Sequence, residues 1–205
     1  MILCDIGNSN VDFYHDGKIW NSTLQEFDNY VASEKVYYIN VNPKMEVKLE
    51  QKKDYINIED FFTIDTIYQG MGIDRVAACY TVKNGIVIDA GSAITVDIML
   101  NFMHLGGYIL PGLSAYSAAY KNISKSLDKR INPNIILDAL PQKTEDAISY
   151  GIIKSIVMML EDTTKNKNIF FTGGDGKFFS KFFENSIYDR TLVFRGMLKA
   201  IEERG

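Results

Sequence analysis

One pattern of residues occurs twice in the chain, and it constrains the fold more than any other feature. Residues 2–14 read ILCDIGNSNVDFY and residues 86–99 read IVIDAGSAITVDIM. Each copy is an apolar strand that ends in an aspartate, followed two positions later by a glycine and then by a second strand with another aspartate. The matched positions are Asp5 with Asp89, Gly7 with Gly91 and, approximately, Asp12 with Asp97. This duplication indicates two similar, closely packed lobes, at 1–83 and 84–205.

The rest of the chain alternates between strand-like and helix-like periodicity. Predicted strands cover residues 2–6, 11–15, 18–20, 35–39, 86–99, 104–110 and 169–171. Predicted helices cover residues 24–31, 43–52, 74–82, 113–124, 144–163 and 192–203. The mixture predicts an α/β protein in which a three-stranded meander opens each lobe.

Composition excludes several classes of protein. A chain of 205 residues, 46% of them hydrophobic, can bury a core without disulfides or a structural metal. Cys4 and Cys79 lie in apolar runs, so we expect buried, reduced thiols. The net charge of -4, with scattered lysines, argues against nucleic-acid binding. The chain opens in a strand and no window approaches the roughly 20 apolar residues of a membrane span, so we expect a cytoplasmic protein.

The repeated aspartates stand where ligands of sheet proteins gather. Asp5 and Asp89 each end a strand, and although aspartate and glycine are ordinary turn residues, the matched pair favours a ligand site. The segments Gly7–Asn10 and Gly91–Ala93 can bring amide N–H groups and hydroxyls close to phosphate oxygens. Because carboxylates repel phosphates unless a cation intervenes, the pattern predicts magnesium, held partly through water.

Four motifs, in the same order, resemble those of the type III pantothenate kinases, a family in the actin, hexokinase and sugar-kinase class. They are Asp5–Asn10, Gly72–Arg75, Asp89–Asp97 and Gly106–Gly112, with weaker matches at Thr144 and Thr172–Asp175. The resemblance implies two duplicated ribonuclease-H-like (actin-like ATPase) lobes, each a mixed sheet flanked by helices. It implies phosphorylation of pantothenate to 4′-phosphopantothenate by ATP, the first step of coenzyme A biosynthesis. The second lobe would hold the second phosphate motif with the substrate and adenosine elements.

The resemblance also implies roles for residues that bind the acceptor substrate. Asp74 matches the carboxylate that takes the proton of the pantothenate hydroxyl, and Arg75 matches the cation that holds the substrate. The other implied substrate contacts are Tyr68, Gly72, Ile73 and Thr144. Without the resemblance, Asp74 and Thr144 would each be an ordinary helix N-cap and Arg75 a solvated residue of the first turn.

On the nucleotide side the resemblance implies a second set of residues. ATP and its phosphates would contact Asp5, Ile6, Gly7, Asn8, Ser9, Asn10 and Ser92. Asp5 would bind magnesium and Asp89 a monovalent cation, K⁺ or NH₄⁺. Ser92 replaces a threonine of the family and keeps its hydroxyl. No lysine closely follows the first phosphate motif, because Asp12 and Tyr14 stand there and Lys18 lies beyond the turn, so metal and amides would contribute more.

The resemblance further implies a homodimer, to which the apolar segment at 113–123 would contribute. We expect His15 and His104 to be structural, because neither has metal-ligand spacing. Two other functions stay open. The first is a kinase of the same fold that acts on another small hydroxy acid or sugar. The second is a non-catalytic, nucleotide-dependent regulatory or assembly protein.

Overall fold

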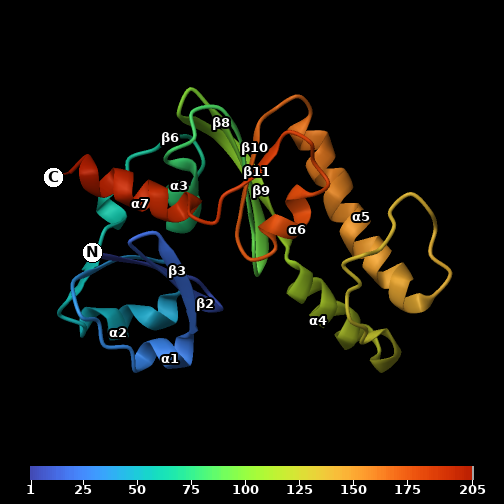
Figure 1. The fold of residues 1–205 in the computed structure, drawn as a ribbon, viewed down its shortest axis with the longest axis horizontal. Helices are drawn as coiled ribbons and strands as arrows, with labels where there is room; N and C mark the ends of the chain where they lie inside the picture. Colours follow the sequence, from blue (N-terminus) through green and yellow to red (C-terminus); the bar gives the residue numbers. More distant parts are fainter. Residues whose placement is uncertain (205) are drawn as a thin grey trace. The chain divides into compact units, whose positions relative to one another are not determined.

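The computed structural model describes residues 1–204, which form two compact units (Figure 1). The first unit contains residues 1–84, 97–106 and 190–204, and the second contains residues 85–96 and 107–189. Each unit is therefore built from segments that are distant in the sequence. The two continuous lobes expected at 1–83 and 84–205 stay a prediction.

The first unit contains a five-stranded mixed sheet. Its order is β3 (Lys18–Thr23), β2 (Asn10–His15), β1 (Ile2–Ile6), β4 (Val36–Asn40) and β5 (Tyr55–Asn57). The first three strands form the predicted antiparallel meander, whereas β4 runs parallel to β1 and β5 runs parallel to β4. The carboxyl ends of β1 and β4 consequently lie at the same edge of this sheet.

Apolar side chains cover both faces of this sheet. On one face, Cys4 and Phe13 pack with Phe27 of α1 (Leu24–Asp28) and Leu49 of α2 (Glu46–Glu50). On the other face, Tyr14 stacks on Phe194, with ring centroids 5.4 Å apart. Strand residues alternate between the two faces, which explains why β1 and β4 are apolar at nearly every position.

The second face is covered by a pair of helices. These are α3 (Ile73–Cys79) and α7 (Leu192–Glu202), which pack against each other. Helix α3 contacts β4, and α7 contacts β1. Helix α3, whose first turn contains the predicted substrate residues Asp74 and Arg75, is therefore held in place by packing against β4 and α7.

A second, six-stranded sheet has the order β11-β10-β7-β8-β9-β6. The bounds are β11 (Ser186–Tyr188), β10 (Ile169–Thr172), β7 (Gly85–Ala90), β8 (Ala93–Leu100), β9 (Met103–Pro111) and β6 (Asp65–Thr66). Strands β7, β10 and β11 are parallel to one another, so their carboxyl ends lie together in the second unit. This is where open α/β sheets bind ligands.

Three helices belong to the second unit. They are α4 (Leu113–Ile123), α5 (Thr144–Thr164) and α6 (Gly176–Ser180). Helix α6 packs on β7, β10 and β11, while the Tyr108 hydroxyl of β9 lies 2.8 Å from the Thr163 hydroxyl of α5. Three 3₁₀ turns complete the chain, at Pro43–Met45, Glu59–Phe61 and Lys125–Leu127. None of the helices in residues 1–204 is long and apolar enough to cross a membrane.

The α/β fold with mixed sheets flanked by helices is confirmed, and both cysteines are free and buried as predicted. One predicted helix was too long. Thr23 and Glu26 form a capping box that starts α1, but the helix ends at Asp28, and Val31, expected on its apolar face, is 88% exposed. Four short elements were missed, namely β5, β6, α6 and β11, because two to five residues give too little periodicity to recognise.

Candidate active site

The first predicted phosphate segment is a tight hairpin. Asp5 and Ile6 end β1, the amide of Gly7 donates to the carbonyl of Asn10 at 3.0 Å, and β2 begins at Asn10. Asn8 and Ser9 form the exposed tip of this turn. The amide of Val41 donates to the Ile6 carbonyl at 3.0 Å, so the turn is attached to the chain that follows β4. The structure thereby brings six predicted phosphate residues together in one short turn.

Asp5 has an acidic neighbour across the hairpin. Asp12 is its registered partner on β2, and the side chains of such a pair lie on the same face. Burial raises the pKa of Asp12, and the positive charge of Arg190 opposes that rise. Arg190, 178 residues later in the chain, is therefore a cation close enough to Asp12 to affect its pKa.

Asp74 lies in the first turn of α3 and is not its N-cap. The N-cap is Gly72, which has an extended backbone conformation, and Ile73 is the first residue of the helix. One carboxylate oxygen of Asp74, Oδ1, accepts the amide N–H of Arg75 at 2.8 Å. Burial raises the pKa of Asp74. This effect is larger than the opposing effects of this hydrogen bond and of the Arg75 charge, which lower the pKa. The N-cap interpretation was therefore wrong, and Asp74 is a partly desolvated carboxylate.

Arg75 is held by a buried ion pair. Its side chain is 5% exposed, and Asp97 of β8, which is 1% exposed, accepts two hydrogen bonds from it. The distances are 3.1 Å from Nε to Oδ2 and 2.6 Å from Nη2 to Oδ1. Burial alone would lower the pKa of Arg75, but these bonds and one to Tyr68 raise it. The alternative of a solvated arginine was wrong.

Tyr68 lies against the same guanidinium group. The Arg75 Cζ atom is 4.8 Å from the centre of the Tyr68 ring, and Nη1 donates to the Tyr68 hydroxyl at 3.3 Å. An arginine over an aromatic face gains a cation–π attraction. Tyr68 and Arg75 are therefore in contact, and Gly72, Ile73 and Asp74 directly precede Arg75 at the start of α3. Their role in substrate binding stays a prediction.

Asp97 is a site neighbour whose role was missed, and His104, which was expected to be structural, lies in the same buried cluster. His104 Nε2 lies 2.9 Å from Asp97 Oδ1, and its Nδ1 lies 2.8 Å from the Thr66 hydroxyl. Asp97 was noticed as part of the repeat, which was the only available signal. Its contact with Arg75 joins residues 22 positions apart on a helix and a strand, and neither periodicity nor spacing indicates such a pair.

The second unit contains a separate crowded corner around Asp89. The corner joins the end of β7, the end of β10 and the start of α4. A Cβ atom on Gly173 would lie 2.3 Å from Asp89 Oδ1 and 2.5 Å from the Ala90 carbonyl oxygen, and Gly173 has φ +80°. A Cβ atom on Gly112 would lie 2.1 Å from the Gly91 carbonyl oxygen. Only glycine allows these backbones to approach so closely.

Ser92 and Thr144 are both exposed in the second unit. The carbonyl of Ser92 accepts the amide of Gly112 at 3.1 Å, which fixes the turn between β7 and β8. Thr144 is the first residue of α5, whose N-cap is Lys143 and which has no side-chain cap. The N-cap interpretation of Thr144 was therefore wrong, and capping does not use its hydroxyl.

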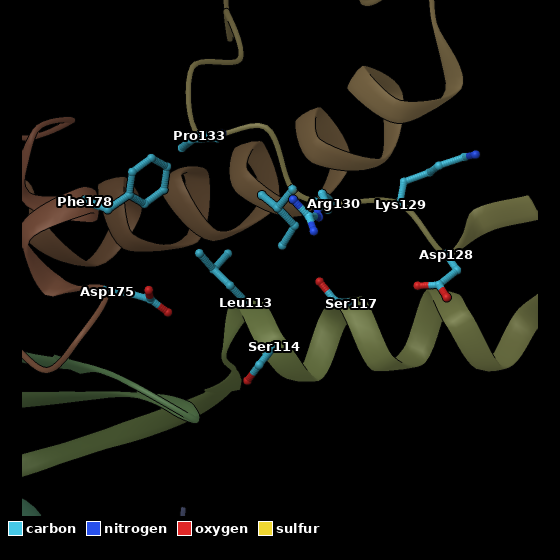
Figure 2. Close-up of a pocket in the computed structure, with 10 residues that line it drawn as sticks. Leu113, Ser114, Ser117, Asp128, Lys129, Arg130, Pro133, Asp175 and Phe178 are labelled. Atoms are coloured by element: carbon cyan, nitrogen blue, oxygen red, sulfur yellow. The ribbon is translucent and has the colours of Figure 1, made fainter. Parts of the chain in front are cut away.

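A pocket of about 690 Å³ opens beside this corner (Figure 2). Leu113, Ser114 and Ser117 of α4 line one wall, and Asp175 and Phe178 line another. The segment that follows α4 contributes Asp128, Lys129, Arg130, Ile131 and Pro133 to the lining. The amide of Asp175 donates to the Ala90 carbonyl at 2.8 Å, so the pocket and the Asp89 corner share a backbone junction. Burial raises the pKa of Asp175.

Within residues 1–204 no three acidic, histidine or cysteine side chains form a group able to hold a metal ion. Magnesium in kinases commonly uses one or two carboxylates together with phosphate oxygens and water. Asp5 provides one carboxylate near the end of β1, next to the Gly7–Asn10 turn, and it fits that kind of site. The Asp89 carboxylate, packed on the Gly173 backbone, offers the oxygen chemistry that an alkali cation needs.

Known proteins resemble this chain over its whole length. The family model of type III pantothenate kinase matches residues 15–166. A type III pantothenate kinase of Campylobacter jejuni is 50% identical over 203 residues, which cover 99% of this chain and 97% of that protein. A crystal structure of a C. jejuni protein, described as a candidate Baf family transcriptional activator, has a TM-score of 0.92 at 48% identity and covers 100% of this chain and 98% of its own.

A more distant structure is similar in fold alone. MreB 5 of Spiroplasma citri bound to AMPPNP has a TM-score of 0.50 at 11% identity and covers 99% of this chain and 97% of its own. This similarity shows that the two chains share a fold. The family model and the full-length identity show that the chain belongs to the type III pantothenate kinase family.

Proposed function

We propose that the protein transfers a phosphoryl group from ATP to pantothenate and forms 4′-phosphopantothenate in the first step of coenzyme A biosynthesis. The main support is the adjacency of Asp74 and Arg75 on the first turn of α3, a carboxylate with a raised pKa beside a fixed guanidinium. This pairing suits a substrate that has both a hydroxyl to be activated and a carboxylate to be held.

Asp74 acts as the general base. Phosphoryl transfer passes through a loose transition state, so the attacking hydroxyl needs alignment and its proton leaves late. The Asp74 oxygen Oδ1 already accepts the Arg75 amide, which leaves Oδ2 to accept the hydroxyl proton. Because burial raises its pKa, Asp74 is a better proton acceptor than an exposed aspartate.

Arg75 holds the substrate carboxylate through one edge of its guanidinium group. Asp97 occupies the edge formed by Nε and Nη2. An arginine has five N–H donors in a planar fork; Asp97 takes two of them and the Tyr68 hydroxyl takes one from Nη1, so Nη1 and Nη2 each keep one donor. Two parallel hydrogen bonds from the edge formed by Nη1 and Nη2 match a carboxylate. Tyr68, Gly72 and Ile73 complete this side of the substrate site.

The first hairpin holds phosphate oxygens of ATP. The segment Asp5–Asn10 contributes amide N–H groups, and Ser92 contributes an exposed hydroxyl. Asp5 would hold magnesium, partly through water, and the ion would supply positive charge to offset that of the phosphate oxygens. Asp89 holds a potassium or ammonium ion, and Thr144 contacts pantothenate through a hydroxyl that capping leaves available.

The pocket beside α4 receives the nucleoside part of ATP. It shares the Ala90–Asp175 junction with the Asp89 corner, and it combines apolar walls from Leu113 and Phe178 with hydroxyl, carboxylate and basic groups (Figure 2). Such a mixture suits a purine ring and a ribose, because small-molecule pockets use apolar walls and a few polar groups. A homodimer, implied by the family resemblance, and a cytoplasmic location, expected from the sequence, are part of this proposal.

A coupled assay of ADP release tests the proposal. Pantothenate should stimulate ADP release by the wild-type protein in the presence of magnesium and potassium, and the product should gain one phosphoryl group by mass spectrometry. A panel of small hydroxy acids and sugars tests the alternative of another kinase of this fold. Phosphorylation of one of these, with none of pantothenate, would refute the assignment, and ATP binding without transfer would favour the regulatory alternative.

A further inference from the structure

A chain of hydrogen bonds connects the two residues assigned to the substrate, Tyr68 through its backbone amide and Arg75 through its side chain. It begins at the Tyr68 amide, which donates to the Thr66 hydroxyl at 3.0 Å. It continues through His104 to Asp97 and ends at the Arg75 guanidinium. Thr66 and His104 are registered partners on β6 and β9, so the pairing of these two strands sets the geometry of the chain.

The direction of each hydrogen bond follows from the donors available. The Asp97 carboxylate can only accept, so His104 Nε2 donates to it. The Thr66 oxygen accepts from the Tyr68 amide and uses its own proton toward His104 Nδ1. A neutral His104 with its proton on Nε2 therefore satisfies every group. Because Arg75 and Asp97 offset each other, this arrangement also keeps the buried cluster without net charge.

Ring packing reinforces the same arrangement. The Tyr68 ring meets the His104 ring edge-on, with centroids 5.7 Å apart. The same Tyr68 ring also packs against the Arg75 guanidinium group. His104 is 1% exposed, so it cannot turn away without loss of these contacts. His104 thus touches Tyr68 directly and reaches Arg75 through Asp97.

We propose that His104 is a positioning residue for substrate binding: through Asp97 and Thr66 it fixes the orientations of Arg75 and Tyr68. The inference rests on the proposed function, in which these two side chains contact pantothenate. Without the donor at Nε2, the Asp97 carboxylate can rotate about its terminal torsion, and the free edge of Arg75 rotates with it. A misdirected edge loses one of its two bonds to the substrate carboxylate.

Two variants of His104 separate its two hydrogen bonds. In His104→Gln the side-chain amide reaches the position of Nε2 and keeps the donor to Asp97. In His104→Asn the shorter amide reaches only the position of Nδ1, and the bond to Asp97 is lost. The chain has one other histidine, His15, which lies on β2 with a 35% exposed side chain. His15→Gln and His15→Asn are therefore matched controls.

Steady-state kinetics on the full chain tests the proposal. We expect His104→Asn to raise the KM for pantothenate roughly 10-fold, the range for loss of a hydrogen bond to a charged group, with the KM for ATP unchanged. His104→Gln and both His15 variants should stay within about 3-fold of wild type. An unchanged KM for pantothenate in folded His104→Asn would overturn the proposal. Equal increases in His104→Gln and His104→Asn would overturn it as well, because they would indicate loss of packing only.

A spectroscopic measurement keeps this test separate from that of the proposed function. Nitrogen-15 NMR of the two histidine rings, assigned with His104→Gln, should show His104 as the neutral tautomer protonated at Nε2. The opposite tautomer would overturn the positioning chain even in an active kinase. Wild-type protein that has the expected tautomer but does not phosphorylate pantothenate would refute the proposed function and not the chain.

Discussion

Replacing Gly173 by alanine tests the crowded corner around Asp89. The added Cβ atom would lie 2.3 Å from Asp89 Oδ1, 2.5 Å from the Ala90 carbonyl oxygen and 2.7 Å from the Ala90 carbonyl carbon. Two of these three atoms are backbone and cannot rotate away. The residue would also have to keep φ at +80°, which L-residues rarely adopt.

The expected loss of stability is the sum of two effects. A left-handed conformation costs a non-glycine residue about 1–2 kcal/mol, and an overpacked site costs about 1–3 kcal/mol. Gly173→Ala should therefore lower the free energy of unfolding by about 2–5 kcal/mol. For a chain of this length, that lowers the midpoint of thermal unfolding by roughly 4–20 °C.

The next residue in the chain provides the control. A Cβ atom on Gly174 would meet nothing within 4 Å, so Gly174→Ala should change the free energy of unfolding by less than about 1 kcal/mol. Both variants can be compared with wild type by urea unfolding followed by circular dichroism. If Gly173→Ala unfolded within about 0.5 kcal/mol of Gly174→Ala, the close approach of Gly173 to Asp89 would not exist in the molecule.

Three further predictions concern the reaction. Asp74→Asn should fold normally and lose about 10²-fold or more in kcat, the usual effect of removing a general base; near-normal turnover would mean that the base lies elsewhere. Because Asp74 must be ionised to accept a proton and burial raises its pKa, kcat/KM for pantothenate should fall on acidification through a pKa above the usual aspartate value of about 3.9. If Asp74→Asn showed the same fall of kcat/KM on acidification, the fall would be caused by the titration of another group. Replacement of potassium by sodium should reduce the rate, and Asp89→Asn should abolish the difference; equal rates of the wild-type protein in both salts would contradict a cation role for Asp89.

Local features of the fold were predictable from the sequence. The hairpin at Gly7 and the turn at Gly91 follow from apolar strands interrupted by glycine and small polar residues. The repeat indicated that two strand ends would each present an aspartate. The bounds of β1 and α5 agree with their predictions to within a residue or two, because each has a strong period and a clear break after it.

Features that depend on distant contacts were not predictable. Arg75 was expected in solvent by local rules, but Asp97, 22 residues later, removes it from water. Arg190 reaches the vicinity of Asp12 from the segment before α7, and His104 contacts Thr66 through strand pairing. The first unit likewise combines three stretches of the chain. Side-chain partners and unit membership of this kind are set by packing, which a single sequence does not encode in any local pattern.

The most direct test of the account is a crystal structure of the protein with pantothenate and a non-hydrolysable ATP analogue bound. The account predicts the pantothenate hydroxyl within about 2.6–3.2 Å of an Asp74 oxygen. It also predicts the pantothenate carboxylate on the Nη1 and Nη2 edge of Arg75. A bound pantothenate whose hydroxyl lay out of reach of Asp74, with its carboxylate on another cation, would contradict the proposed mechanism.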